Sequence, residues 1–157
     1  MLKKNIAILG LGEHQLESIR YLKKYYDIIG FDEDENCPGK KIIHSYFNIG
    51  LKKKNKILEI CKKYKIEFAV TFCNEYFLQL TNDINKKIGL SNNSKLVSLI
   101  SNKYLYKKKI VNFDNKLLPE YRNVSKISNL KNLFFPSVLK PKYGSGSKGV
   151  LYLKNSS

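Results

Sequence analysis

The sequence has 157 residues, of which 43% are hydrophobic and 27% are charged. This length suits one ordinary domain, or one small domain with part of another, and the apolar fraction excludes disorder as the main description. The 29 Lys and Arg residues outnumber the 13 Asp and Glu residues, which gives a formal charge of +16.

The positive charge favours a solvated lysine coat over a dedicated nucleic-acid surface. Arg20 and Arg122 are the only arginines, whereas bidentate recognition of bases and phosphates relies on arginine. The lysines are also spread along the chain instead of gathering on one element. A basic nucleic-acid-associated protein remains an alternative, because lysine alone releases phosphate counterions.

Cysteine usage and hydropathy indicate a cytoplasmic protein. The apolar run from Ile6 to Leu11 is far shorter than the roughly 18 residues that span a bilayer, so we expect no signal peptide and no membrane span. Cys37, Cys61 and Cys73 are odd in number and widely spaced. They form neither a Cys-x-x-Cys zinc pair nor a disulfide framework, which fits a reducing compartment.

The N-terminal part of the chain alternates between strand and helix patterns. Residues 5–10 form a continuous apolar run that ends in glycine, as a buried parallel strand does. A helix is predicted over about 13–24 and a second strand over 27–32. Together these segments predict a β-α-β unit.

The alternation continues toward residue 90. Ile57, Leu58 and Cys61 predict a helix over about 53–63, followed by a buried strand over 67–72 and a helix over about 75–87 that ends at Gly89. The chain is therefore predicted to be an α/β protein with a Rossmann-like, doubly wound parallel sheet.

The pattern changes after Leu90. One or two polar helices are predicted between residues 94 and about 109, and residues 112–132 are loop-rich. Apolar strand character returns at 134–140 and again at 150–153. Between these two strands lies a tip rich in glycine and serine, so we expect a β-hairpin with a long, flexible loop.

The first segment that could carry chemistry is the turn after the first strand. Gly10 and Gly12 lie at a strand-to-helix turn, where missing Cβ atoms let backbone amides approach an anion. Asp32 follows about twenty residues later, as a ribose-binding carboxylate does in dinucleotide-binding proteins. Gln15 stands where that motif has its third glycine. An NAD or other dinucleotide site is thus one interpretation, and a structural turn with a solvated Asp32 is the other.

The second segment is the glycine and serine loop from Lys142 to Gly149. Its backbone amides and hydroxyls could surround phosphate oxygens, while Lys140 and Lys148 supply positive charge on either side. A plain hairpin loop on the surface is the alternative for the loop taken alone.

Taken in order, these segments resemble the N-terminal part of an ATP-grasp ligase, close to the carbamoyl-phosphate-synthase-like and biotin-carboxylase-like branch. The matching segments are Ile6–Gly12 with Gln15, Asp32 with Cys37-Pro38-Gly39, residues 56–66, residues 88–94, the pair Asn102-Lys103, and residues 135–150. The last match, a strand ending in Lys140-Pro141 before the glycine-rich loop, is the most specific. The resemblance implies a pre-ATP-grasp domain over 1–90, a helical connector over 91–115, and a truncated ATP-grasp subdomain over 116–157.

The resemblance also implies site residues. Lys103 would contact ATP phosphate, and Lys140 would point toward the adenine and the α-phosphate. The β- and γ-phosphates would be covered by Gly144, Ser145, Gly146, Ser147 and Gly149. Gly10, Gly12 and Glu13 would line a substrate cleft, with a simple turn and a helix N-terminal acid as the alternative. Asn102 stands where some relatives carry Asp, which we interpret as a tolerated variant.

In this family ATP converts a carboxylate to an acyl phosphate, which an amine or similar nucleophile then attacks. The Mg²⁺ ligands of the family would lie beyond Ser157, so the resemblance implies no metal ligand in this chain. We therefore expect a fragment of a ligase that is inactive alone. The edge of the predicted hairpin, Val138 to Leu153, would be unpaired, which favours self-association or disorder there.

Overall fold

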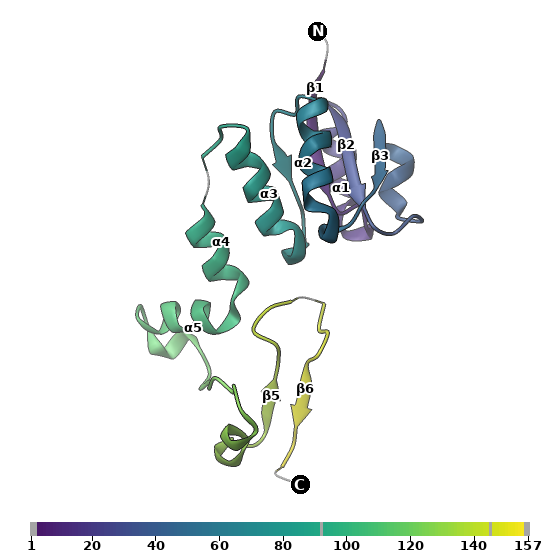
Figure 1. The fold of residues 1–157 in the computed structure, drawn as a ribbon. Coiled ribbons are helices and arrows are strands. Elements are labelled where there is room, and N and C mark those ends of the chain that lie inside the picture. Colours follow the sequence, from purple (N-terminus) through teal and green to yellow (C-terminus); the bar gives the residue numbers. More distant parts are fainter. Residues whose placement is uncertain (1–2, 92, 145, 156–157) are drawn as a thin grey trace. The chain divides into compact units, whose positions relative to one another are not determined.

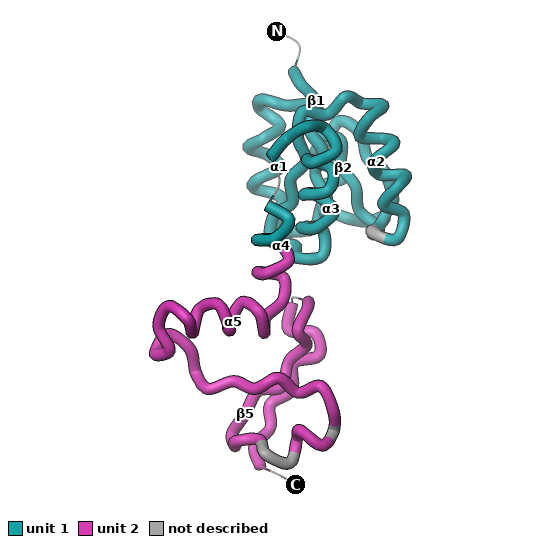
Figure 2. The backbone as a smooth tube through the Cα atoms, turned by 60° about the vertical axis from the view of Figure 1, so that its left-hand side comes forward, with its two compact units in different colours: residues 1–97 teal, residues 98–157 magenta. Residues whose placement is uncertain are grey.

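The structure is a computed structural model that describes residues 3–91, 93–144 and 146–155. It divides into two compact units, Met1–Val97 and Ser98–Ser157, which Figures 1 and 2 show from two directions. No helix in these described residues is long and apolar enough to cross a membrane.

The first unit is built on a four-stranded parallel sheet. Its strands are β1 (Lys4–Leu9), β2 (Tyr26–Asp32), β3 (Ser45–Asn48) and β4 (Ala69–Val70), in the order β3-β2-β1-β4. The predicted α/β class with a parallel sheet is confirmed.

Helices connect these strands and follow them. They are α1 (Leu16–Leu22), α2 (Lys54–Lys63), α3 (Glu75–Lys87) and α4 (Ser94–Ser101), with short 3-10 helices at Glu13–Gln15, Pro38–Ile42 and Leu51–Lys53. The helix predicted over 13–24 is therefore a 3-10 turn that continues into a shorter α-helix.

The sheet is covered on both faces, because successive side chains of a strand point to opposite sides. Ile6 and Ile8 of β1 pack in one cluster with Ile19 of α1, whereas Ala7 and Leu9 pack in another with residues of α2 and α3. These four residues of β1 are fully buried. This explains the continuous apolar run of the sequence and confirms the doubly wound arrangement.

Strand β3 was missed by sequence reasoning. Ser45–Asn48 carries no apolar run, and its residues are at most half-buried. His44 lies directly before it, where Nδ1 accepts a hydrogen bond from the backbone N–H of Ile28 at 3.2 Å and Nε2 lies 2.9 Å from Oδ1 of Asp27. These contacts align β3 with β2 in the register Ile29 to Ser45.

Strand β4 is shorter than the predicted strand over 67–72. The Asn85 side chain of α3 accepts a hydrogen bond from the backbone N–H of Ala69 at 2.7 Å and donates one to the Ala69 carbonyl at 2.9 Å. The amide thus occupies the backbone groups that a further strand would pair with. A covered edge of this kind protects a sheet against association.

The second unit contains α5 (Lys103–Val111) and a two-stranded antiparallel sheet of β5 (Ser137–Leu139) and β6 (Leu151–Leu153), with 3-10 helices at Asn115–Leu117 and Ile127–Asn132. The predicted hairpin is present, but only three residues of each strand pair. Pro136 and Pro141 flank β5, and proline has no N–H to donate to a ladder.

Candidate functional site

The glycine turn after β1 is held by its own side chains. Gly10 has a φ of +86°, and a Cβ there would stand 2.3 Å from Nε2 of Gln15. Gln15 is only 4% exposed, and its Oε1 accepts a hydrogen bond from the backbone N–H of Phe72 at 3.2 Å. Gly10 is therefore required as glycine for conformation and for space, whereas nothing lies within 4 Å of a Cβ at Gly12.

Asp32 also serves this turn. Its Oδ2 accepts a hydrogen bond from the backbone N–H of Leu11 at 2.7 Å, and its Oδ1 accepts one from the backbone N–H of Asp34 at 2.9 Å. The carboxylate that would hold a ribose in a dinucleotide site thus binds the protein backbone. This geometry favours the structural interpretation of Asp32.

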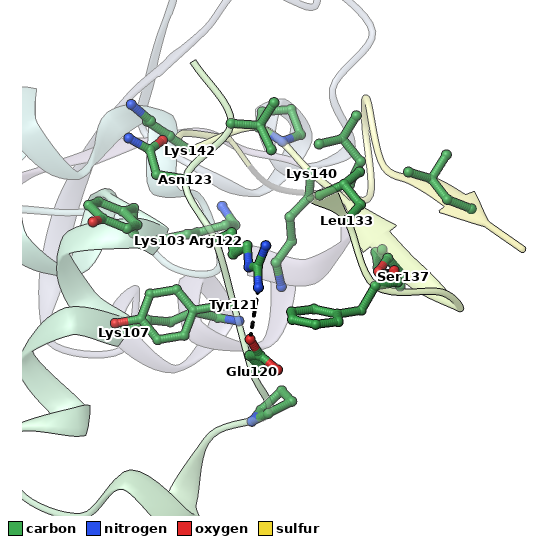
Figure 3. A pocket seen from close by; sticks show the side chains of 18 of the residues that line it. Lys103, Lys107, Glu120, Tyr121, Arg122, Asn123, Leu133, Ser137, Lys140 and Lys142 are labelled. Carbon is green, nitrogen blue, oxygen red and sulfur yellow. Dashed lines mark hydrogen bonds and ion pairs between the residues drawn. The ribbon is translucent and has the colours of Figure 1, made fainter. Parts of the chain in front are cut away.

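A cavity of about 920 Å³ lies within the second unit (Figure 3). Its walls come from α5, from the segment Pro119–Val124, from residues 133–142 without Phe135, and from Tyr152 and Leu153. Four separate stretches of the sequence therefore share one hollow.

The start of α5 is tied to the glycine-rich loop. Asn102 caps the helix, because its Oδ1 accepts hydrogen bonds from the backbone N–H groups of Tyr104 and Leu105, both at 3.1 Å. Its Nδ2 donates to the Tyr143 hydroxyl at 2.9 Å. One side chain thus caps the helix and contacts the loop.

Lys103 lies at the same junction. Its backbone N–H donates to the Lys142 carbonyl at 2.9 Å, and its ammonium donates to the Gly144 carbonyl. Two predicted site features, Lys103 and the base of the loop, are thereby brought together, and Lys103 lines the cavity.

Lys140 follows directly after β5 and also lines the cavity, opposite residues of α5. Lys107 lies one helical turn beyond Lys103. Burial, and to a smaller degree the nearby Lys140 ammonium, lowers the pKa of Lys107. The cavity therefore holds cations that repel one another, and an anion between them would relieve that repulsion.

Sequence reasoning did not predict four charged residues of the cavity as site residues. They are Lys107, Glu120, Arg122 and Lys142, of which Lys142 begins the predicted loop. Nη2 of Arg122 lies 3.5 Å from Oε1 of Glu120, and its guanidinium carbon lies 4.1 Å from the centre of the Phe134 ring. The four-residue spacing from Lys103 to Lys107 was an available signal, since such residues share one helix face.

The glycine-rich loop needs its glycines. Gly149 has a φ of +72°, and a Cβ there would stand 3.0 Å from Cγ of Pro141. Gly144, Gly146 and Ser147 also have positive φ angles.

Not every predicted site residue reaches the cavity. Ser145 lies outside the described residues. Of the described loop residues, only Lys142 lines the cavity, and Tyr143, Gly144 and residues 146–149 lie outside its lining. Gly10, Gly12 and Glu13 belong to the first unit.

The site offers no ready metal centre in the part of the chain that the structure describes. Histidine, cysteine, aspartate and glutamate side chains there form no group of three or more that could hold a metal ion. All three cysteines carry free thiols, of which only the Cys73 thiol is exposed.

Comparison with known proteins places this fold. No family model matches the chain, and no curated protein matches it. Solved structures, in contrast, match nearly the whole chain. N5-carboxyaminoimidazole ribonucleotide synthetase from Thermotoga maritima matches 98% of this chain and 41% of its own, with a TM-score of 0.69 and 21% identity.

Two further structures give the same result. N5-carboxyaminoimidazole synthetase from Staphylococcus aureus, complexed with ADP, matches 98% of this chain and 43% of its own, with a TM-score of 0.77 and 17% identity. L-amino acid ligase from Bacillus licheniformis matches 99% of this chain and 40% of its own, with a TM-score of 0.75 and 16% identity. The chain spans about two fifths of the length of these structures, and it has the fold of the N-terminal part of ATP-grasp ligases.

Proposed function

We propose that this chain forms the nucleotide-binding N-terminal part of an ATP-dependent ligase, which activates a carboxylate as an acyl phosphate for attack by an amine or similar nucleophile. The observation that carries the proposal is the cavity of the second unit, where Lys103, Lys107 and Lys140 share one hollow and Glu120 is the single acidic residue among the described residues of the lining.

The residues present fit a nucleotide. A volume of about 920 Å³ falls within the roughly 300–1,000 Å³ of small-molecule sites. The lysines supply charge for phosphates, and the tyrosines supply apolar surface. The rings of Tyr104 and Tyr121 meet edge to face with 6.0 Å between their centres, which gives the cavity a firm aromatic wall.

The proposed roles follow from charge and position. Phosphoryl transfer depends mainly on positioning and on stabilising charge. In the free chain, the ammonium of Lys103 binds the Gly144 carbonyl, and a phosphate oxygen would replace that partner. Lys140 would hold the phosphate nearer the nucleoside. Gly144, Ser145, Gly146, Ser147 and Gly149 would close over the terminal phosphates and exclude water.

Finer assignments belong to the same proposal. Gly10, Gly12 and Glu13 would line the cleft for the second substrate. The pre-ATP-grasp domain would cover 1–90, the connector 91–115, and the beginning of the ATP-grasp subdomain 116–157. The motif from Phe135 to Val150 supports the carbamoyl-phosphate-synthase-like and biotin-carboxylase-like branch.

We further propose that catalysis requires Mg²⁺ ligands from outside these 157 residues, so the chain alone would bind nucleotide without turning it over. Mg²⁺ would supply the neutralising charge for transfer of the γ-phosphoryl group. The unpaired hairpin edge favours self-association, and the free thiols fit a cytoplasmic location.

Isothermal titration of the 157-residue chain with ATP, ADP and NAD tests the nucleotide assignment. We expect ATP and ADP to bind and NAD not to compete with them. Lys103→Met and Lys140→Met should each weaken ATP binding, whereas Lys108→Met, an exposed lysine of the same helix outside the cavity, should not. Binding of NAD in preference to ADP, or equal loss in all three variants, would overturn the proposal.

A further inference from the structure

Lysine pairs gather at the edge of the first unit where the parallel strands begin. In a parallel sheet all strands begin at one edge, and a helix that follows a strand runs back to that edge. Figure 1 shows the start of β1 and the ends of α2 and α3 on the same side of this unit. The pairs are Lys3-Lys4 at the start of β1, Lys23-Lys24 after α1, Lys62-Lys63 in the last turn of α2 and Lys86-Lys87 in the last turn of α3.

Contacts at the start of β1 join the two faces of the sheet at this edge. On one face, the ammonium of Lys3 donates a hydrogen bond to the carbonyl of Lys23 at 2.7 Å, directly after α1. On the other face, Nδ2 of Asn5 donates to the carbonyl of Tyr64 at 2.7 Å, directly after α2. The ends of α1 and α2 therefore lie on either side of β1, and their lysine pairs share one edge.

This edge has an excess of positive charge. The side chains of all four pairs are exposed, and so is Lys65 between α2 and β4. Lys4 forms an ion pair with Glu67, whereas the other paired lysines form no ion pair with a described residue. A lysine at the end of a helix is favourable by itself through the helix dipole. The fold adds the gathering of several such ends, which produces a local positive field that attracts polyanions.

Two exposed tyrosines lie among these lysines. Tyr21 in the last turn of α1 is 59% exposed, and Tyr25 directly before β2 is 57% exposed. Their ring centres are 5.5 Å apart, and Nζ of Lys24 lies 5.7 Å from the centre of the Tyr21 ring. Lysines that track a phosphate backbone, next to aromatic rings on which bases stack, are the combination that binds single-stranded nucleic acid.

The composition of the edge favours this partner over other anionic ones. A membrane-binding surface needs a broad apolar face, whereas lysines surround the two tyrosine rings here. A duplex keeps its base faces stacked inside, so the rings would add nothing to its binding. Arg20, the arginine nearest to these tyrosines in the sequence, is paired with Glu17, and readout of base edges relies on arginine. We therefore expect contacts to phosphates and base faces, without sequence preference.

We propose that this edge, which we call the lysine edge, binds single-stranded nucleic acid, with the lysine pairs on the phosphates and Tyr21 and Tyr25 against the bases. The glycine turn follows the other end of β1, and the cavity belongs to the second unit. The inference therefore goes beyond the proposed function and does not rest on it.

Fluorescence anisotropy with labelled oligouridylate and oligothymidylate of about 20 nucleotides tests the lysines over a series of salt concentrations. Both strands should bind the wild-type chain. The double variants Lys23→Gln with Lys24→Gln, and Lys62→Gln with Lys63→Gln, should each reduce the slope of log K against log salt by about 1.4, since each phosphate contact contributes about 0.7. The matched control is Lys52→Gln with Lys53→Gln, an exposed pair before the other end of α2. It should leave the slope unchanged.

A second double variant tests stacking on the tyrosines. Tyr21→Leu with Tyr25→Leu should weaken binding of both single strands about fivefold or more. It should leave the affinity for a DNA duplex of the same length unchanged, because the duplex offers no free base faces. Tyr21→Phe with Tyr25→Phe keeps the rings and should bind like the wild type. Circular dichroism of each variant verifies that it is folded.

Several results would overturn the inference. An equal loss in the Lys52 and Lys53 control, or an unchanged affinity in the leucine variant, would leave only general attraction to a basic protein. Vesicles of phosphatidylserine that lose binding in the lysine variants, while the oligonucleotides stay bound, would assign the edge to a membrane. Excess ATP should not displace the oligonucleotides. Displacement would place the strand in the cavity of the second unit, which contradicts the lysine edge and leaves the proposed function standing.

Discussion

Replacing Asn102 by alanine should destabilise the second unit by about 2 kcal/mol. The Asn102 side chain is 7% exposed and serves two structures at once. Its Oδ1 accepts hydrogen bonds from Tyr104 and Leu105, and losing a helix cap costs about 1 kcal/mol. Its Nδ2 donates to the Tyr143 hydroxyl at 2.9 Å, and such a bond contributes about another 1 kcal/mol.

Two companion variants separate these contributions. Asn102→Asp keeps the cap, because Asp and Asn cap helices equally well, and the Tyr143 hydroxyl can rotate to donate to the carboxylate. Its cost should therefore be near zero. Tyr143→Phe removes only the contact with the loop and should cost about 1 kcal/mol. Adding Tyr143→Phe to Asn102→Ala should cost almost nothing further, since the partner is already gone.

Hydrogen exchange of the α5 amides, read together with urea unfolding followed by circular dichroism, measures these effects. Exchange in α5 reports the cap locally, whereas the urea midpoint reports the whole transition. If Asn102→Asp destabilises as much as Asn102→Ala, the hydrogen-bonding explanation is wrong. Simple additivity of Tyr143→Phe and Asn102→Ala would likewise refute the contact between the helix cap and the loop.

Three further predictions address the first unit. Gly10→Ala should lower the free energy of unfolding by about 2–3 kcal/mol, through its positive φ and the displacement of Gln15, whereas Gly12→Ala should be nearly neutral; urea titration compares them. Burial raises the pKa of the Cys61 thiol from 9.0 to about 12. The contribution of the buried, protonated thiol to the free energy of unfolding is therefore present below pH 9, and it is lost between pH 9 and 12 because only the unfolded thiol ionises there. Cys61→Ala should flatten the fall of stability over that range by comparison with wild type. Thiol titration of the native chain should label Cys73 alone, as the only exposed cysteine of the three, and rapid labelling of a second thiol would contradict the buried positions of the others.

The two central strands and the helices of the first unit could be predicted from the sequence, because a strand that is buried on both faces of a parallel sheet consists of a continuous apolar run. The run before Gly10 and the strand that ends at Asp32 are therefore legible without coordinates. The helix predicted over 75–87 has those bounds in the structure, since its apolar positions repeat at the helical period and Gly89 follows its end.

Where the local sequence pattern is weak, contacts with neighbouring segments determine the secondary structure instead. Ser45–Asn48 becomes a strand because β2 offers a free edge and His44 holds the approach to it. Of the strand predicted over 67–72, only Ala69–Val70 pairs in register with β1. The outer backbone groups of Ala69 bond the side chain of Asn85, sixteen residues later, instead of a further strand. Neither partner is visible in the local sequence.

The cavity required tertiary structure most of all. Lys103 and Lys140 were predicted from motifs, but Glu120 and Arg122 lie in a loop-rich stretch with no periodicity, and Lys107 was one lysine among many. The net charge of a sequence is only a sum over its residues, and by itself it is explained by lysines that are exposed to solvent. Only the fold decides which of these cations meet in one hollow. Their mutual repulsion and their ability to bind an anion depend on the distances between them, and these distances are set by the packing of α5, the segment Pro119–Val124 and β5.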